Sequence, residues 1–240
     1  MDKCIACGIC AEKCPKKVID AYDGGLTKRK AIYVKYAQAV PLKYAIERAY
    51  CIYLTKGKCR ACEKFCPSHA INFEDKEKEL NLNVGEIILA AGSETYDPGS
   101  HDTYGYKKYP NVITSLEFER ILSASGPYGG HLVRPSDKKE PKKIAWLQCI
   151  GSRDEHLGAK GYCSSVCCTY AVKEAMLAKE HSKEELDTAI FYIDIRTIGK
   201  DFEQYYNRAK NESGVRFVKS KITNIDHIDE SGSHLIRYLD

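Results

Sequence analysis

The chain has 240 residues, of which 43% are hydrophobic and 29% charged, so its composition excludes a disordered or collagen-like protein. Its 37 basic and 33 acidic residues leave a net charge of +4, which is too balanced to indicate a nucleic-acid-binding surface. No apolar run approaches the roughly 18 residues of a transmembrane helix, and no secretory signal precedes Cys4. We therefore expect a cytoplasmic protein without a membrane span, in which the twelve cysteines indicate metal or redox chemistry.

Eight of the cysteines form two groups near the start of the chain. The first group has the spacing C-x2-C-x2-C-x3-C-P, with Gly8 relaxing the backbone between the thiolates, and the second widens the first gap to seven residues. This is the ferredoxin run, in which three cysteines of one run share a [4Fe–4S] cluster with the fourth cysteine of the other. It assigns one cluster to Cys4, Cys7, Cys10 and Cys66, and the other to Cys14, Cys51, Cys59 and Cys62. Zinc, which usually binds two separated C-x2-C pairs, is the alternative for all eight.

Weaker patterns follow in chain order. Apolar positions spaced as on a helix predict a short helix over 42–49, and the mixed charges of 74–79 predict a solvated linker. Residues 80–92 predict a strand that ends in Ala90, Ala91 and Gly92, small residues that let a flat ligand approach closely or simply form a tight turn. The capping box Thr114–Glu117 predicts a helix over 114–124.

From residue 143 onward, strands alternate with helices. The predicted strands are 144–149, 188–195 and 215–219, and the predicted helices are 165–180 and 201–211, the latter with Asp201 as its N-cap. This alternation predicts a parallel sheet with right-handed crossovers, as in half of a Rossmann-like domain. Residues 220–240 indicate a short strand or hairpin. The loop after the first strand has one glycine in place of G-x-G-x-x-G, so we do not expect a nucleotide at this turn.

Four more cysteines belong to this half of the chain: Cys149, Cys163, Cys167 and Cys168. Their spacing alone leaves a metal centre, buried structural cysteines and a redox-active pair as alternatives. The N-terminus of a helix favours anions, so thiolates or an anionic cluster would suit the start of the helix predicted over 165–180. We interpret the loop between the first predicted strand and this helix as a dinucleotide cradle converted to hold metal.

The combination of motifs resembles the A-type subunits of heterodisulfide reductase, which are iron–sulfur flavoproteins, over nearly the whole chain. The stretches that carry the resemblance include Arg29-Lys-Ala-Ile-Tyr33, Val84-Gly-Glu-Ile-Ile-Leu-Ala-Ala-Gly92, Gln148-Cys-Ile-Gly-Ser-Arg-Asp154, Tyr162-Cys-Ser-Ser-Val-Cys-Cys168 and Asp194-Ile-Arg196. The resemblance implies a mixed α/β and α+β fold, in which a two-cluster ferredoxin-like domain precedes part of a thioredoxin-reductase-like, Rossmann-type flavoprotein domain. The expected division is a ferredoxin-like domain at 1–79, a partial FAD-domain segment with a linker at 80–140, and a partial Rossmann-like domain at 141–240.

The resemblance also implies cofactors and site residues. It assigns a third [4Fe–4S] cluster to the cysteines from Cys149 to Cys168, and it places Ala90, Ala91 and Gly92 near FAD, where Ala91 replaces a threonine of the family. Lys173 matches a lysine near the flavin, with a solvent-facing helix lysine as the alternative. The family has a G-x-G-x-x-G ahead of the point where this chain begins at Met1. We therefore expect a central segment that binds three clusters, and binds FAD tightly only when another chain supplies the pyrophosphate-binding unit.

The function that the resemblance implies is electron transfer by an oxidoreductase subunit that relays electrons among its clusters and FAD. No residue acts as a nucleophile or general base, so the disulfide would be reduced on a partner subunit. The implied partners are heterodisulfide reductase subunits of the B and C types, an electron-input subunit of a hydrogenase or formate dehydrogenase, and ferredoxin. The rival hypothesis is a ferredoxin-like carrier or docking module with a structural second domain.

Overall fold

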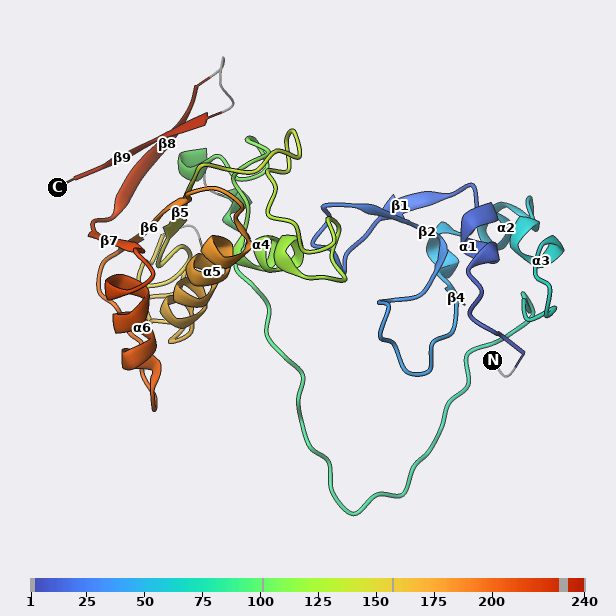
Figure 1. Cartoon of the computed structure of the whole chain (residues 1–240). Coiled ribbons are helices and arrows are strands. Elements are labelled where there is room, and N and C mark those ends of the chain that lie inside the picture. The colour runs from blue at the N-terminus through green and yellow to red at the C-terminus, as the bar shows by residue number, and fades with distance from the viewer. Residues whose placement is uncertain (1–2, 101, 157, 229–232, 240) are drawn as a thin grey trace. The chain divides into compact units, whose positions relative to one another are not determined.

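The computed structural model of the chain describes residues 3–100, 102–156, 158–228 and 233–239. The chain divides into two compact units, residues 1–93 and 94–240 (Figure 1). The described part is mixed α/β with several small sheets, as expected. Met1 and the turn of the expected C-terminal hairpin, residues 229–232, lie outside the described ranges. The finer division at residues 79 and 140 stays a prediction.

The first unit is built from short elements that hold the cysteine loops. Two antiparallel pairs form its sheets, β1 (Lys17–Ile19) with β2 (Lys28–Lys30) and β3 (Ile32–Tyr33) with β4 (Ala45–Ile46). The helical pieces are α1 (Ile9–Lys13), η1 (Arg48–Tyr50), α2 (Ile52–Lys56) and α3 (Ala61–Lys64). Val18, Ala31 and Ile32 are its buried aliphatic side chains, so the apolar core of this unit is small. A domain with such a core usually depends on a metal or disulfides for its stability.

The helix predicted over residues 42–49 is wrong. This segment contains strand β4 and then the 3-10 turn η1. A segment this short gains little from helix formation by itself. Here its backbone pairs instead with β3, and the Glu47 amide donates to the carbonyl of Ala31 at 2.9 Å.

The strand predicted over residues 80–92 is also wrong. The structure assigns neither helix nor strand there, and the segment runs as an extended connection between the two units (Figure 1). Its apolar side chains are exposed, Ile88 by 90% and Leu89 by 88%. A strand requires a neighbour to accept and donate its backbone hydrogen bonds, and neither unit provides one to this segment within the described residues.

The second unit is organised by a parallel three-stranded sheet of order β5-β6-β7, formed by β5 (Lys143–Leu147), β6 (Asp187–Tyr192) and β7 (Arg216–Lys219). Helix α5 (Cys167–His181) connects β5 to β6, and α6 (Phe202–Asn211) connects β6 to β7. The hairpin of β8 (Ile222–Ile228) and β9 (Ser233–Tyr238) follows. Helix α4 (Ser115–Leu122) and the 3-10 turns η2 (Pro98–Ser100) and η3 (Asp102–Tyr104) precede the sheet.

Each face of this sheet has its own apolar layer. On one face, Ile190 of β6 belongs to a core with α4, α5 and α6, and the two crossover helices lie side by side (Figure 1). On the other face, Ala189 and Phe191 pack against Ile222 and Ile225 of the hairpin. Successive strand residues point to opposite faces, which explains how one short strand serves both layers. The sheet is therefore covered on both sides, as parallel sheets generally are.

Most predicted elements of this unit are confirmed. The three strands, helices α5 and α6 and the C-terminal hairpin fall where the pattern placed them, within a few residues. The capping box at the start of α4 is also confirmed, because Thr114 Oγ1 accepts from the Glu117 amide and the Glu117 carboxylate accepts from the Thr114 amide. Asp201 does occupy the N-cap position of α6, but its side chain makes no capping hydrogen bond and its φ is +67°.

Glu174 is a buried acid in the core between α4, α5 and β5. It is 5% exposed, and it accepts hydrogen bonds from Trp146 Nε1 at 2.8 Å and from the Ser115 hydroxyl. Burial raises the pKa of this carboxyl to about 7, although these two hydrogen bonds oppose the shift. The negative charge of Glu119 raises the pKa further, and the positive charge of Lys173 lowers it. Folding therefore favours the protonated form of Glu174.

This shift predicts a pH dependence of stability. The folded state holds the Glu174 proton more tightly than the unfolded state, so the free energy of unfolding should fall as pH rises from about 4.5 to about 7. The fall should amount to about 3 kcal/mol at most, since one pKa unit corresponds to about 1.4 kcal/mol. Thermal unfolding followed by circular dichroism between pH 5 and 8 measures it. Glu174→Gln should flatten the profile, whereas Glu119→Gln, which alters an exposed carboxylate, should leave most of the slope. A Glu174→Gln profile as steep as that of the unaltered chain would contradict the prediction.

Candidate metal centres

The loop of the first three cysteines is a tight turn that leads into α1. Gly8 is the N-cap of this helix at φ +81°, and Ala6 also has a positive φ. A β-carbon at Gly8 would lie 3.2 Å from the hydroxyl of Tyr44, so both the positive φ and this close approach favour glycine here. Lys43 donates to the carbonyl of Cys4 and fixes the loop from the other side.

The structure gathers Cys4, Cys7, Cys10 and Cys66 at this loop. Burial raises the pKa of the Cys10 thiol, and negative charge on each of the other three raises it further. Burial also opposes ionisation of Cys66, but the Ala70 amide, 3.3 Å from its Sγ, and the Ser68 hydroxyl outweigh it and lower the pKa of that thiol. One member of the set is thus prepared as a thiolate by amide and hydroxyl donors.

The other four cysteines of this unit line one small cavity. Cys14, Cys51, Cys59 and Cys62 form part of its wall, together with Ile32, Ile46 and Phe73 among other side chains. Burial raises the pKa of Cys62 to about 11, and the charges of Cys51, Cys14 and Cys10 add to the shift. Because Cys10 of the other set also acts on Cys62, the partition of the eight cysteines between two clusters stays a prediction, as does ligation by these residues.

The chemistry of these two sets fits iron–sulfur clusters. None of the eight cysteines forms a disulfide, and thiols crowded together ionise together only when a cation compensates their charge. Among the described residues, no three His, Cys, Asp or Glu side chains are arranged so that they could hold a metal ion. A [4Fe–4S] cluster makes a different demand, because each of its four thiolates binds a different iron atom.

The third set lies at the carboxyl end of the parallel sheet. Cys149 follows β5 with φ +62°, and Gly151 has φ +76° with the ring of Tyr96 so close that a β-carbon there would lie 2.2 Å from it. Cys167 and Cys168 begin α5 and are 8% and 3% exposed. Backbone in the left-handed region at a non-glycine residue is uncommon and marks a segment held by its surroundings.

The thiols of this set interact with one another in pairs. Burial raises the pKa of Cys149, and the charges of Cys167 and Cys163 raise it further. The interaction between the adjacent Cys167 and Cys168 thiols lowers the pKa of Cys167 and raises that of Cys168, whose Sγ donates to the Asp194 carbonyl at 3.8 Å. The Ser165 amide donates to Cys163 Sγ at 3.3 Å. The spacing left a metal centre, structural cysteines and a redox pair open, and ligation of a cluster by these four residues stays a prediction.

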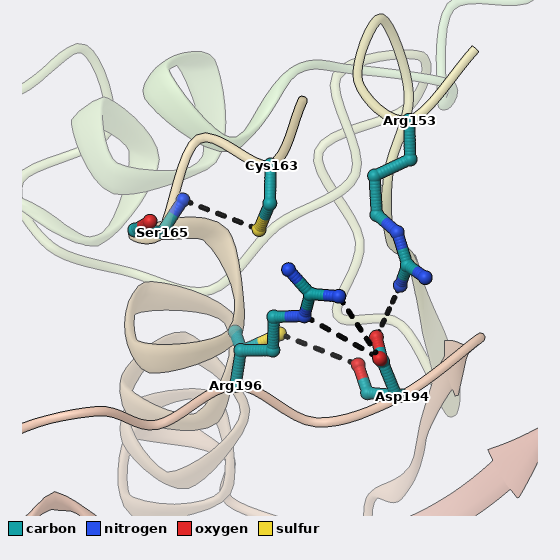
Figure 2. Close-up of polar contacts among 6 residues, drawn as sticks. Arg153, Cys163, Ser165, Asp194 and Arg196 are labelled. Carbon is teal, nitrogen blue, oxygen red and sulfur yellow. Dashed lines mark hydrogen bonds and ion pairs between the residues drawn. The ribbon is translucent and has the colours of Figure 1, made fainter. Parts of the chain in front are cut away.

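Two arginines and an aspartate border this third set. Figure 2 shows Arg153 and Arg196 directed at the carboxylate of Asp194. Arg153 lies in the loop after β5, and the other two residues follow β6. Sequence reasoning assigned these residues no role. The available signal was their position, because functional residues of parallel sheets gather beyond the carboxyl ends of neighbouring strands.

The residues expected near a flavin are not brought together by any described contact. Ala90, Ala91 and Gly92 lie in the exposed connection between the units, and a β-carbon at Gly92 would meet nothing within 4 Å. Lys173 lies on α5 with its Nζ 3.9 Å from Glu119 Oε1, an exposed ion pair. Their role at FAD stays a prediction.

Comparison with known proteins first identifies the class. A family model described as a 4Fe-4S binding domain matches residues 1–20, which contain the first four cysteines. The start of the chain therefore carries a 4Fe–4S binding domain. No helix in the described part of the chain is long and apolar enough to cross a membrane.

Similarity to individual proteins extends over the whole chain. The A-type iron–sulfur subunit of the CoB–CoM heterodisulfide reductase of Methanocaldococcus jannaschii is 44% identical over 99% of this chain and 35% of its own length. An A-type subunit of the same description from Methanopyrus kandleri is 45% identical over 98% of this chain and 35% of its own length. The A-type subunit of the H2/formate:CoB–CoM heterodisulfide,ferredoxin reductase of Methanococcus maripaludis is 44% identical over 100% of this chain and 35% of its own length. The resemblance to the A-type subunits of heterodisulfide reductase is confirmed, and the chain spans about a third of the length of these curated relatives.

The geometry of the first loop predicts the effect of Gly8→Ala. Placing alanine at a positive φ costs about 1–2 kcal/mol. At Gly8 the added carbon also presses on Tyr44 inside the cysteine loop, so we expect a lower melting temperature and fewer irons per chain. Gly57→Ala is the matched control, since Gly57 has φ +67° but nothing within 4 Å of the added carbon. Equal iron content and equal melting temperatures in the two variants would show that the Gly8 loop does not constrain metal binding.

Proposed function

We propose that this chain is the electron-relay segment of a heterodisulfide reductase-type oxidoreductase subunit, with three [4Fe–4S] clusters. The observation that carries the proposal is that Cys14, Cys51, Cys59 and Cys62, distant in the chain, line one small cavity of the first unit. Charge interactions that link Cys10 with Cys4, Cys7 and Cys66, and Cys149 with Cys163 and Cys167, support the other two sets. Such clusters accept and donate single electrons over a wide range of potentials. Within this chain the ligands would be Cys4, Cys7, Cys10 and Cys66; Cys14, Cys51, Cys59 and Cys62; and Cys149, Cys163, Cys167 and Cys168.

The protein groups around each set support a relay in place of catalysis. Near the first set, the donors to thiol sulfur are the Ala70 amide and the Ser68 hydroxyl, which stabilise a thiolate and attack nothing. Around the third set the polar neighbours are Arg153, Asp194 and Arg196, which pair with one another. These groups adjust the charge at a redox centre. The disulfide reduction itself would then take place on a partner subunit.

We further propose that the second unit is part of a thioredoxin-reductase-like, Rossmann-type FAD domain. Its parallel sheet and two crossover helices support this assignment. The loop from Cys149 to Asp154 has one glycine and is bordered by thiols, so it offers no pyrophosphate cradle. Ala90, Ala91, Gly92 and Lys173 would contact the flavin once a separate pyrophosphate-binding unit is present. The proposed location is cytoplasmic.

The partners follow from the relay function and from the relatives' names. One relative belongs, by its name, to an H2/formate:CoB–CoM heterodisulfide,ferredoxin reductase. We propose that this chain acts with heterodisulfide reductase subunits of the B and C types, with ferredoxin, and with an electron-input subunit of a hydrogenase or formate dehydrogenase.

Iron and acid-labile sulfide counting on anaerobically purified chain tests the proposal. We expect about twelve irons per chain from three clusters, and about eight in the Cys163→Ser variant, which removes a ligand of the third set only. Cluster binding requires thiolate ligands. Because Cys163 belongs to the third set alone, the variant should lose one cluster and keep the other two.

The same measurement distinguishes the rival functions. About eight irons in the unaltered chain would support a ferredoxin-like carrier or docking module with a structural second unit. A colourless protein that contains zinc would contradict the iron–sulfur assignment altogether.

A further inference from the structure

The third cysteine set differs from the other two in its charged surroundings. The Asp194 carboxylate accepts from Arg153 Nη1 through one oxygen, and from Arg196 Nη2 at 3.3 Å and Nε at 3.4 Å through the other (Figure 2). The Arg153 side chain is 24% exposed and the Asp194 side chain 44%. We refer to these three residues as the arginine–aspartate bridge. It joins the loop after β5 to the segment after β6, and both segments border the third set.

The bridge also reaches the sulfur atoms. Cys168 Sγ lies 3.8 Å from the backbone carbonyl oxygen of Asp194 and donates to it (Figure 2). Burial raises the pKa of Cys149, and the positive charge of Arg153 opposes this shift. Pairing with Asp194 raises the pKa of Arg196, and the charge of Cys163 raises it further. Three of the four cysteines thus interact with a residue of the bridge.

The charge of the bridge has a predictable effect on electron transfer. Reduction adds one negative charge to a cluster, so nearby positive charge and donors to its sulfurs favour the reduced state. Two guanidinium groups and one carboxylate leave one net positive charge beside the third set. Asp194 pairs with both arginines and thereby holds them in place, while its own charge partly offsets theirs.

We propose that Arg153 and Arg196 are positioning residues that raise the reduction potential of the third cluster, and that Asp194 both orients them and limits the increase. The proposal rests on the proposed function, because it requires a cluster at the third set. It makes this centre a better electron acceptor than its cysteine ligands alone would.

Redox titration of the anaerobically purified full chain, followed by electron paramagnetic resonance, tests the proposal. The signal that disappears in Cys163→Ser identifies the third cluster. Arg153→Gln and Arg196→Gln should each lower the midpoint potential of the third cluster by up to about 59 mV, which corresponds to a tenfold change in a one-electron equilibrium. Arg153→Lys keeps the charge and should retain part of the effect. Asp194→Asn removes negative charge and should raise the potential.

The opposite signs separate an electrostatic role from a structural one. Loosening of the site would move all variants in the same direction, and that result would overturn the proposal, as would unchanged potentials in both glutamine variants. Arg216→Gln is the matched control, because Arg216 pairs with Asp187 at 2.9 and 3.0 Å at the other end of β6. The third-cluster potential of this variant should equal that of the unaltered chain. If a glutamine variant loses iron, the third-cluster potentials of Asp194→Asn and Arg153→Lys still show whether added positive charge raises the potential.

The outcomes also distinguish this proposal from the proposed function. About eight irons per chain, with no signal that depends on Cys163, would show that the third cluster is absent and would overturn both proposals. A chain with about twelve irons whose third-cluster potential ignores all three bridge residues would retain the relay and overturn the role of the bridge.

Discussion

Bringing like-charged sulfur atoms together is the constraint on which the rest of this structure depends. A thiolate beside other thiolates is unfavourable, and burial makes it more so, as the raised pKa values of Cys10, Cys62 and Cys149 record. The two units meet this cost differently. The first unit has little apolar core and surrounds its sulfurs with short loops, whereas the second sets them at the edge of an apolar core covered on both sides of its sheet. In the first unit, metal binding and folding are therefore expected to be strongly coupled.

The parallel sheet explains why the second unit can keep four cysteines and three charged residues close together. Cys149 and Arg153 follow β5, Asp194 and Arg196 follow β6, and α5 begins with Cys167 and Cys168. All of these positions lie at one end of the sheet because parallel strands end at the same edge. A helix N-terminus at that edge adds partial positive charge. The topology thus gathers sulfur, guanidinium and amide donors from segments that are distant in the chain.

Sequence patterns predicted the helices and strands that the spacing of apolar residues specifies. They missed the features that depend on contact with a distant segment of the chain. The alternation after residue 143 specified β5, α5, β6, α6 and β7, because each element buries a regular apolar face. Residues 42–49 and 80–92 had equally regular patterns, but the first pairs with β3 and the second has no strand beside it within the described residues. The arginine–aspartate bridge was beyond reach for the same reason. Arg153 and Asp194 are 41 positions apart, and only the fold shows that they meet.

The exposed connection at residues 80–92 has a consequence for the solution behaviour of the isolated polypeptide. It carries Leu, Ile and Val side chains that are 56–90% exposed, and its unpaired backbone offers hydrogen bonds to any extended neighbour. Short apolar segments of high β-propensity, with little charge and no proline, associate readily with copies of themselves. Ile87, Ile88 and Leu89 form the centre of such a segment. We expect the colloidal stability of the isolated chain to depend on this stretch, where Glu86 is the one charge available to oppose self-association.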